Sequence, residues 1–214
     1  MRPKREPKKY KYILIDWDGN IAQTLDAWFI ACKLPLVKRN PSLSDARIIE
    51  GFNDTKLWGV DDLEDVFKEA DYIAETLLPD IKLYPDALEV IEKLYQRGKK
   101  LAIVTTAPRK NVDFILKKYK FSRYFDAIVT GDDVTFHKPH TEPLEKALQL
   151  MGGKKEKAII VGDSDKDLDA ARKLGIDSIL FFPVSNQKFY NLEQLNKSLP
   201  TYVLQDFKTI LDII

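Results

Sequence analysis

The sequence predicts an α/β fold: a three-layer, Rossmann-like parallel sheet with an α-helical subdomain inserted into it. Short apolar runs alternate with longer patterns of helical periodicity, which is typical of a parallel sheet wound with helices. One connection between these runs is far longer than the others and carries helical patterns of its own. At 214 residues, the chain is long enough to bury the core of such a domain.

Six apolar runs are the predicted strands. Each is almost continuous in apolar residues, as expected of strands that helices cover on both faces, and the last run is the weakest. They occupy residues 12–16, 100–106, 126–131, 157–163, 177–182 and 201–204. Between them, the helical patterns over residues 87–98 and 167–176 each include a glycine near the end, where glycine serves as a C-cap.

The long connection is the predicted insertion. From residue 21 to residue 82 no run indicates a strand, yet three segments show helical periodicity, over residues 22–34, 42–52 and 60–78. A structureless connection of this length is unusual inside a compact domain. We therefore expect residues 21–82 to form a helical cap, inserted into an α/β core made of residues 1–20 and 83–214.

Apolar side chains in this segment indicate that the cap has a small core of its own. We expect Trp28, Phe29 and Trp58 to pack there, because large aromatic side chains dominate the energetics of small cores. Cys32 lies inside a helical pattern, and we expect it to be a small buried side chain.

Composition and charge narrow the classes of partner. Lys plus Arg total 34 against 33 for Asp plus Glu, so a net charge of +1 gives no electrostatic case for nucleic acid or a membrane surface. Residues 1–11 carry six bases and one acid, and we expect them to form a solvated tail. The near-neutral charge therefore predicts a small-molecule partner. One cysteine and no long apolar run predict a cytoplasmic protein. A monomer is the default state for a chain of this size.

Polar residues cluster where the predicted strands end. In open α/β sheets, ligands bind at the carboxyl ends of the strands, so residues placed there are expected to share one site. Lys138 precedes a predicted helix and completes the set. The others are Asp16 and Asp18 after the first strand, Thr105 and Thr106 after the second, and Asp163 and Asp167 after the fourth.

These residue types suit phosphoryl chemistry. Three carboxylates brought together repel one another unless protons or a cation neutralise them, which favours a hard divalent ion such as Mg²⁺. A threonine hydroxyl and a lysine ammonium supply a donor and a positive charge for phosphoryl oxygens. One aspartate can attack phosphorus, and a second can act as general acid and then as general base.

The same residues resemble the four motifs of the haloacid dehalogenase superfamily. The matching elements are DWDGN at 16–20, a strand ending in Thr105, Lys138 before Pro139, and VGDSDKD at 161–167. The resemblance runs from about residue 12 to residue 182. Further segments resemble the subgroup with a helical cap after the first motif, which includes phosphoglycolate phosphatases, small sugar-phosphate phosphatases and β-phosphoglucomutase.

The resemblance implies a role for each aspartate. Asp16 would be the nucleophile, and Asp18 would be the general acid and base. The Mg²⁺ ligands would be Asp16, Asp18 through its backbone carbonyl, and Asp163. Asp167 would orient the lysine or a metal-bound water.

The resemblance also assigns the phosphoryl-binding groups. Thr105, Thr106 and Lys138 would bind the phosphoryl oxygens. Asn20 departs from the family, which usually has Thr or Val at this position. The cap would close over the site and contribute selectivity.

The same motifs separate the reactions of this superfamily. Asp18 is present, whereas dehalogenases and phosphonatases lack the second aspartate. Mutases of the β-phosphoglucomutase type have a histidine where this chain has Trp28. We therefore predict a Mg²⁺-dependent phosphatase that hydrolyses a small phosphorylated metabolite, of the phosphoglycolate or sugar-phosphate type, through an aspartyl-phosphate. The alternatives are a phosphomutase of the β-phosphoglucomutase type and a non-catalytic phospho-ligand-binding or phosphoacceptor signalling protein.

Overall fold

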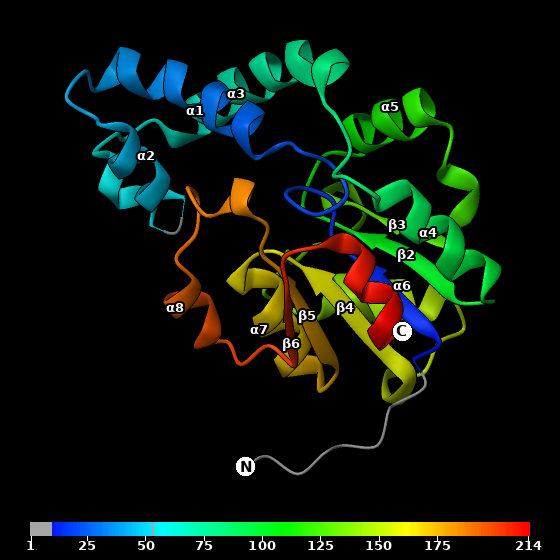
Figure 1. Ribbon diagram of the computed structural model, residues 1–214. Helices are drawn as coiled ribbons and strands as arrows, with labels where there is room; N and C mark the ends of the chain where they lie inside the picture. The colour runs from blue at the N-terminus through cyan, green and yellow to red at the C-terminus, as the bar shows by residue number, and fades with distance from the viewer. Residues whose placement is uncertain (1–9, 53) are drawn as a thin grey trace. The chain divides into compact units, whose positions relative to one another are not determined.

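The computed structural model describes residues 10–52 and 54–214. Most of the predicted basic tail, residues 1–9, therefore lies outside the described residues. The chain divides into two compact units: the part up to Ala22 together with Leu83–Ile214, and Gln23–Lys82 (Figure 1). We call them the α/β unit and the helical unit and describe each by itself.

The α/β unit contains a six-stranded parallel sheet with the strand order β3-β2-β1-β4-β5-β6. Register places Leu14 of the central strand beside Ala102 and Ile160 of its two neighbours. The predicted fold class is confirmed, and each predicted run contains a strand, including the weak last one. The strands are β1 Tyr12–Ile15, β2 Lys100–Val104, β3 Ala127–Val129, β4 Ala158–Gly162, β5 Asp177–Phe181 and β6 Tyr202–Leu204.

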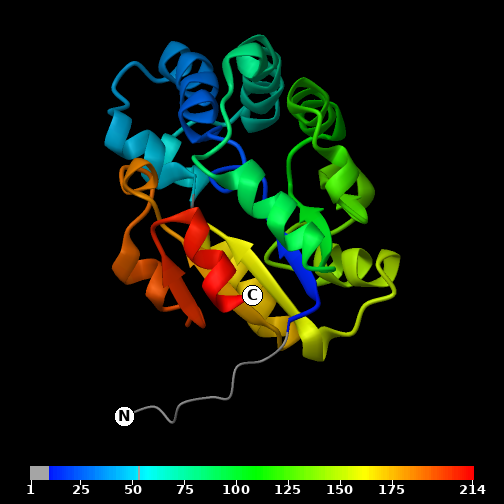
Figure 2. The same cartoon turned by 45° about the vertical axis from the view of Figure 1, so that its right-hand side comes forward.

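Helices cover both faces of this sheet (Figures 1 and 2). Helices α6 and α7 pack on one face, and α4 packs with α9 on the other. The helices of this unit are α4 Ala87–Gln96, α5 Arg109–Tyr119, α6 Glu142–Leu150, α7 Asp165–Leu174, α8 Leu192–Asn196 and α9 Ile210–Ile213. Short 3₁₀ turns lie at η3 Ser122–Tyr124, η4 Gly131–Asp133, η5 Lys155–Lys157, η6 Val184–Asn186 and η7 Phe207–Thr209.

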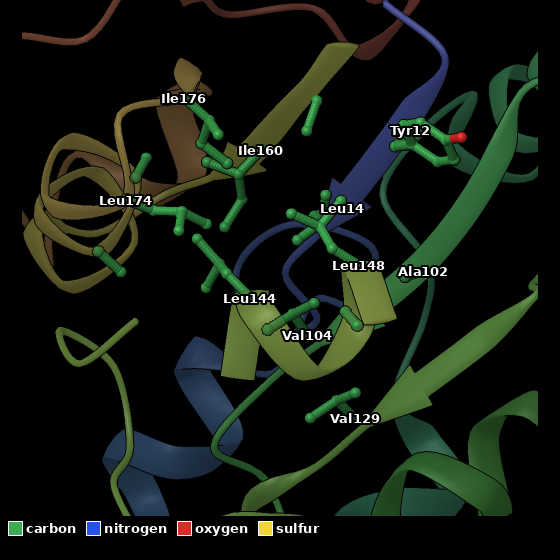
Figure 3. Packing of buried hydrophobic residues seen from close by; sticks show 14 of the residues in the cluster. Tyr12, Leu14, Ala102, Val104, Val129, Leu144, Leu148, Ile160, Leu174 and Ile176 are labelled. Carbon is green, nitrogen blue, oxygen red and sulfur yellow. The ribbon is translucent and has the colours of Figure 1, made fainter. Parts of the chain in front are cut away.

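One buried cluster joins the sheet to α6 and α7. Figure 3 shows Leu14 of β1 and Ile160 of β4 among side chains of both helices, including Leu144 and Leu174. Because side chains alternate along a strand, Ile13 and Ile15 point to the opposite face, and they too are fully buried. The central strand is therefore covered on both sides.

The helical unit is built around Trp58. Its ring is fully buried, and its indole Nε1 donates a hydrogen bond of 2.9 Å to the carbonyl of Ile48. Trp28 and Phe29 are partly buried against the same cluster, as predicted, and Cys32 is buried in it. The elements are α1 Leu25–Arg39, α2 Asp45–Gly51, η1 Thr55–Trp58, α3 Leu63–Leu77 and η2 Leu78–Asp80.

Among the described residues, no helix combines the length and the apolar character needed to cross a bilayer.

Candidate active site

A tight turn follows β1 and presents its two aspartates. The backbone N–H of Asp16 still bonds to the carbonyl of Val161 at 2.9 Å, which holds Asp16 against β4. The chain then turns: the carbonyl of Trp17 accepts hydrogen bonds from Ile21 and Ala22, both at 3.0 Å. Gly19 has a φ of +67°, a conformation that glycine adopts without steric cost. The turn leaves Asp16 buried and Asp18 partly buried.

Three carboxylates meet at the carboxyl ends of β1 and β4. Oxygen atoms of Asp16, Asp163 and Asp167 all lie within 4.8 Å of one another, and all three side chains are buried. The register explains part of this meeting, because Ile15 pairs with Val161 and both strands end at the same edge. Asp167 joins from the first turn of α7, which begins after Ser164.

Among the described residues, one buried lysine, Lys138, faces this cluster. The Nζ atom of Lys138 lies 2.7 Å from Asp16 Oδ1 and 2.5 Å from Asp167 Oδ1, and it donates to the carbonyl of Val104 at 2.9 Å. Three ionised carboxylates and one ammonium would leave a net charge of about two negatives in a buried place. Such a charge is costly unless further positive charge or protons offset it.

Burial and the repulsion between neighbouring carboxylates both shift the pKa values of these groups. Burial raises the pKa of Asp16 to about 7; the charge of Asp167 adds to the rise, and Lys138 opposes it. Burial, followed by the charges of Asp16 and Asp167, also raises the pKa of Asp163 well above its usual range. Burial acts to lower the pKa of Lys138, but the two carboxylates beside it outweigh burial and raise it. The cluster therefore suits a divalent cation that prefers oxygen ligands.

Asp167 differs from the other two carboxylates because its own helix uses it. Its Oδ2 accepts hydrogen bonds from the backbone N–H of Ser164 at 3.2 Å and from the Ser164 hydroxyl at 2.6 Å, while Oδ1 bonds to Lys138. Both oxygens are thus already engaged. This arrangement suits a carboxylate that positions Lys138, and it leaves Asp16 and Asp163 as the side chains that fit a cation.

The second strand delivers Thr105 beside Asp18. The Thr105 hydroxyl oxygen accepts a hydrogen bond from the N–H of Ala107 at 3.0 Å and lies 3.5 Å from Asp18 Oδ2. Thr105 is buried, whereas the neighbouring Thr106 is exposed. The carboxylate of Asp18 is not part of the group of three, so its assignment as a ligand through the backbone carbonyl stays a prediction.

Two residues that the sequence did not single out also reach the cluster. Asn186 is fully buried and donates from Nδ2 to the carbonyl of Gly19 at 2.8 Å, with Asp163 Oδ2 at 3.5 Å. The hydroxyl of Tyr190 forms a hydrogen bond with Asp163. Both follow the end of β5, and that position at the carboxyl edge of the sheet was the one signal available.

Asn20, the residue that departs from the motif, has an unusual environment. Its side chain is fully buried, and within the described part of the chain neither its amide oxygen nor its amide nitrogen has a hydrogen-bond partner. Buried amides are normally hydrogen-bonded, and one without partners reduces stability.

Comparison with known proteins places this geometry in a family. The family profile described as haloacid dehalogenase-like hydrolase matches residues 13–181, from β1 to the last residue of β5. The chain belongs to the haloacid dehalogenase-like hydrolase family. The predicted membership of this superfamily is thereby confirmed.

Curated relatives of this haloacid dehalogenase-like chain carry the name pyrophosphatase PpaX. The protein from Bacillus cereus (strain AH820) is 43% identical over 95 residues, which cover 44% of this chain and 44% of the relative. That from Bacillus mycoides (strain KBAB4) is 34% identical over 134 residues, which cover 63% of this chain and 60% of the relative. The chain therefore spans about half the length of the curated relatives it matches.

Solved structures of haloacid dehalogenase-like proteins share the fold. A candidate haloacid dehalogenase-like hydrolase from Bacteroides fragilis has a TM-score of 0.84 at 22% identity, covering 94% of this chain and 100% of that one. A candidate phosphoglycolate phosphatase from Lactobacillus plantarum has a TM-score of 0.84 at 20% identity, covering 96% and 100%. At these identities the similarity shows the fold alone.

Proposed function

We propose that the protein is a Mg²⁺-dependent phosphatase that hydrolyses a small phosphorylated metabolite of the phosphoglycolate or sugar-phosphate type. The observation that supports this most directly is the buried group of Asp16, Asp163 and Asp167 around the single ammonium of Lys138. Structural hydrogen bonding alone does not account for so much like charge in one buried place. A site that binds a cation together with a phosphoryl group does account for it.

Asp16 is the proposed nucleophile. A carboxylate oxygen of Asp16 attacks phosphorus, and the bond from phosphorus to the ester oxygen of the substrate breaks. Asp18 gives a proton to the departing oxygen, so the products of this half-reaction are an alcohol and an aspartyl-phosphate. Lys138, which contacts Asp16 Oδ1, holds that carboxylate in place and offers positive charge to the phosphoryl oxygens.

Hydrolysis of the aspartyl-phosphate completes the cycle. Asp18, now ionised, takes a proton from a water molecule whose oxygen attacks phosphorus. The bond between phosphorus and the Asp16 oxygen breaks, which releases inorganic phosphate and restores the carboxylate. The hydroxyl of Thr105, 3.5 Å from Asp18 Oδ2, is placed to bind a phosphoryl oxygen beside this residue, with Thr106 adding a contact from the same turn.

Asp16 and Asp163 are the side chains proposed to hold Mg²⁺, with Asp18 contributing its backbone carbonyl. A bound Mg²⁺ would neutralise charge on the phosphoryl oxygens and offset the repulsion among the carboxylates. The raised pKa of Asp16 fits this role, since a cation favours the ionised form that a nucleophile needs.

The helical unit is proposed to be the cap that selects the substrate. Its basic side chains are mostly engaged within the unit: Lys33 pairs with Asp45 at 2.7 Å, and Arg39 pairs with Asp62 at 2.6 Å and Glu69 at 2.7 Å. A substrate with several anionic groups would have to displace such pairs. This favours a small substrate with few anionic groups besides its single phosphoryl group.

Phosphate release by the purified protein tests the proposal. The panel contains phosphoglycolate, sugar phosphates and nucleotides, and inorganic pyrophosphate is added because two relatives are named pyrophosphatases. We expect selective, Mg²⁺-dependent release that EDTA abolishes and that Asp16→Asn reduces by roughly a thousandfold or more. Asp169→Asn is the matched control, because Asp169 pairs with Arg172 on the exposed side of α7.

Other outcomes of this assay would contradict part of the proposal or favour one of the alternative functions. Interconversion of sugar phosphates without net phosphate release would make the protein a mutase. Substantial activity in Asp16→Asn would remove Asp16 as the nucleophile. A folded protein that binds Mg²⁺ but leaves every phosphoester intact would favour a non-catalytic phospho-ligand-binding or phosphoacceptor role.

A further inference from the structure

The segment that follows β5, residues 183–190, reaches the carboxylate cluster from outside the four motifs. The family match ends at residue 181, so this segment lies beyond it. It begins with the 3₁₀ turn η6 Val184–Asn186 and leads into α8. Two of its side chains, Asn186 and Tyr190, contact residues of the site.

Asn186 links two parts of the site through a fully satisfied side chain. Its Nδ2 group donates to the carbonyl of Gly19, in the turn that carries Asp18, and lies within 3.5 Å of Asp163 Oδ2. Its Oδ1 accepts hydrogen bonds from the hydroxyls of Tyr84 and Ser185. An amide held by four partners and shielded from water has little freedom to reorient.

Tyr190 approaches the same carboxylate. Its ring packs against the buried cluster of Leu168, Leu180, Phe182 and Leu195, and its hydroxyl bonds to Asp163. A phenol keeps its proton near neutral pH, so the Tyr190 hydroxyl is the donor and the Asp163 carboxylate is the acceptor.

We propose that Asn186 and Tyr190 are positioning residues for cation binding: they hold the Asp163 carboxylate and the Gly19 turn in the orientation that a divalent cation requires. The inference rests on the proposed function of Asp163 as a cation ligand. Donors behind a ligating carboxylate fix its rotamer and occupy lone pairs that would otherwise take up water. The affinity for Mg²⁺ would thus depend on a segment outside the family's motifs.

The test measures Mg²⁺ binding alone, by isothermal titration calorimetry without substrate. Tyr190→Phe removes one oxygen and keeps the ring in its apolar cluster. We expect Mg²⁺ to bind about 10- to 100-fold more weakly, which is the usual cost of losing such a partner. In turnover assays, the Mg²⁺ concentration for half-maximal rate should rise by a similar factor, while kcat at saturating Mg²⁺ changes little.

Tyr10→Phe is the matched control. Its hydroxyl donates to Asp177 Oδ2 at 2.8 Å, so Tyr10, like Tyr190, is a tyrosine bonded to an aspartate. Asp177 begins β5, whereas Asp163 follows the end of β4. The two tyrosine–aspartate pairs therefore lie at opposite ends of the parallel strands, Tyr10 at the amino ends and Tyr190 at the carboxyl ends. We expect Tyr10→Phe to lower the melting temperature about as much as Tyr190→Phe while leaving the affinity for Mg²⁺ unchanged.

Asn186→Ser provides a second, independent variant, because serine is too short to reach both Gly19 and Asp163. It should weaken Mg²⁺ binding in the same way, with the fold checked by circular dichroism. Wild-type protein that does not bind Mg²⁺ would overturn both this inference and the proposed metal site. Wild-type protein that binds Mg²⁺, with equal affinity in folded Tyr190→Phe and Asn186→Ser, would overturn this inference alone.

Discussion

The ammonium of Lys138 lies 2.7 Å from Oδ1 of Asp16, and both side chains are buried. The same ammonium bonds to Asp167 at 2.5 Å, so Lys138 joins the carboxylate that follows β1 to a carboxylate in the first turn of α7. Opposite charges in a place shielded from water interact strongly, and removal of one partner leaves the other uncompensated.

Lys138→Met should destabilise the protein by about 3 kcal/mol or more at pH 8, because three buried carboxylates would then face one another without the ammonium. The loss should be smaller at pH 5, where Asp16 and Asp163, whose pKa values are raised, can take up protons. Thermal denaturation in EDTA at the two pH values measures the difference. Lys100→Met is the control, because Lys100 pairs with Asp126 at the exposed start of β2. A Lys138 variant as stable as this control would contradict the charge argument.

Stability without metal should fall as the pH rises toward neutrality. The pKa of Asp16 is about 7 in the folded protein, raised by burial from 3.8, so between these values the folded state binds more protons than the unfolded state. The stability that this proton uptake confers is present at low pH and is lost as the pH rises through about 7.

Mg²⁺ should therefore stabilise the protein more at pH 8 than at pH 5, since it binds the ionised carboxylates. Melting temperatures in EDTA and in Mg²⁺ across this range give the comparison. Asp16→Asn should show a shallower loss in EDTA than the wild type. The same increment from Mg²⁺ at both pH values would argue against a cation site formed by these residues.

Gly162→Ala should damage the site through Asp167. A Cβ atom at residue 162 would lie 2.4 Å from the Asp167 Cβ and 2.7 Å from its Oδ2, so Asp167 would have to move away from Lys138. We expect a loss of about 1 to 3 kcal/mol in stability together with a clear fall in kcat.

Gly98→Ala is the control that separates a loss of stability from a loss of kcat. Gly98 has a φ of +71°, and a Cβ there would meet no atom within 4 Å, so this variant adds backbone strain far from the cluster. It should lose stability, by about 1 kcal/mol, without loss of kcat. If Gly162→Ala retained full kcat, the position of Asp167 would not matter for turnover.

The sequence could predict the sheet and most of the site for simple physical reasons. Strands buried on both faces read as continuous apolar runs, and even the short edge strand β6 was found. Asp16, Asp163 and Lys138 come together because parallel strands end at one edge, and α7 begins at Asp165, two residues earlier than predicted, since Ser164 and Asp167 bond reciprocally at its start.

Asn186 and Tyr190 could not be predicted in the same way. The sequence around an asparagine or a tyrosine in a polar segment does not show whether the side chain is solvated or buried. Only the three-dimensional path of the chain brings Asn186 and Tyr190 to Asp163. The separation of Asp18 from the carboxylate group has a similar origin, because it depends on the turn at Gly19. Periodicity places whole elements but does not give the contacts of single polar side chains.

Asn20→Val should stabilise the protein, contrary to the usual effect of replacing a buried side chain. The amide of Asn20 is fully buried, and among the described residues it has no hydrogen-bond partner, so its removal relieves a desolvation cost of about 1 to 3 kcal/mol. For a chain of this size, each 1 kcal/mol corresponds to roughly 2 to 4 °C in melting temperature. Asn186→Val is the matched control, since Asn186 is equally buried but fully hydrogen-bonded, and it should be destabilised. A fall in melting temperature for both variants would mean that the amide of Asn20 stabilises the turn after β1.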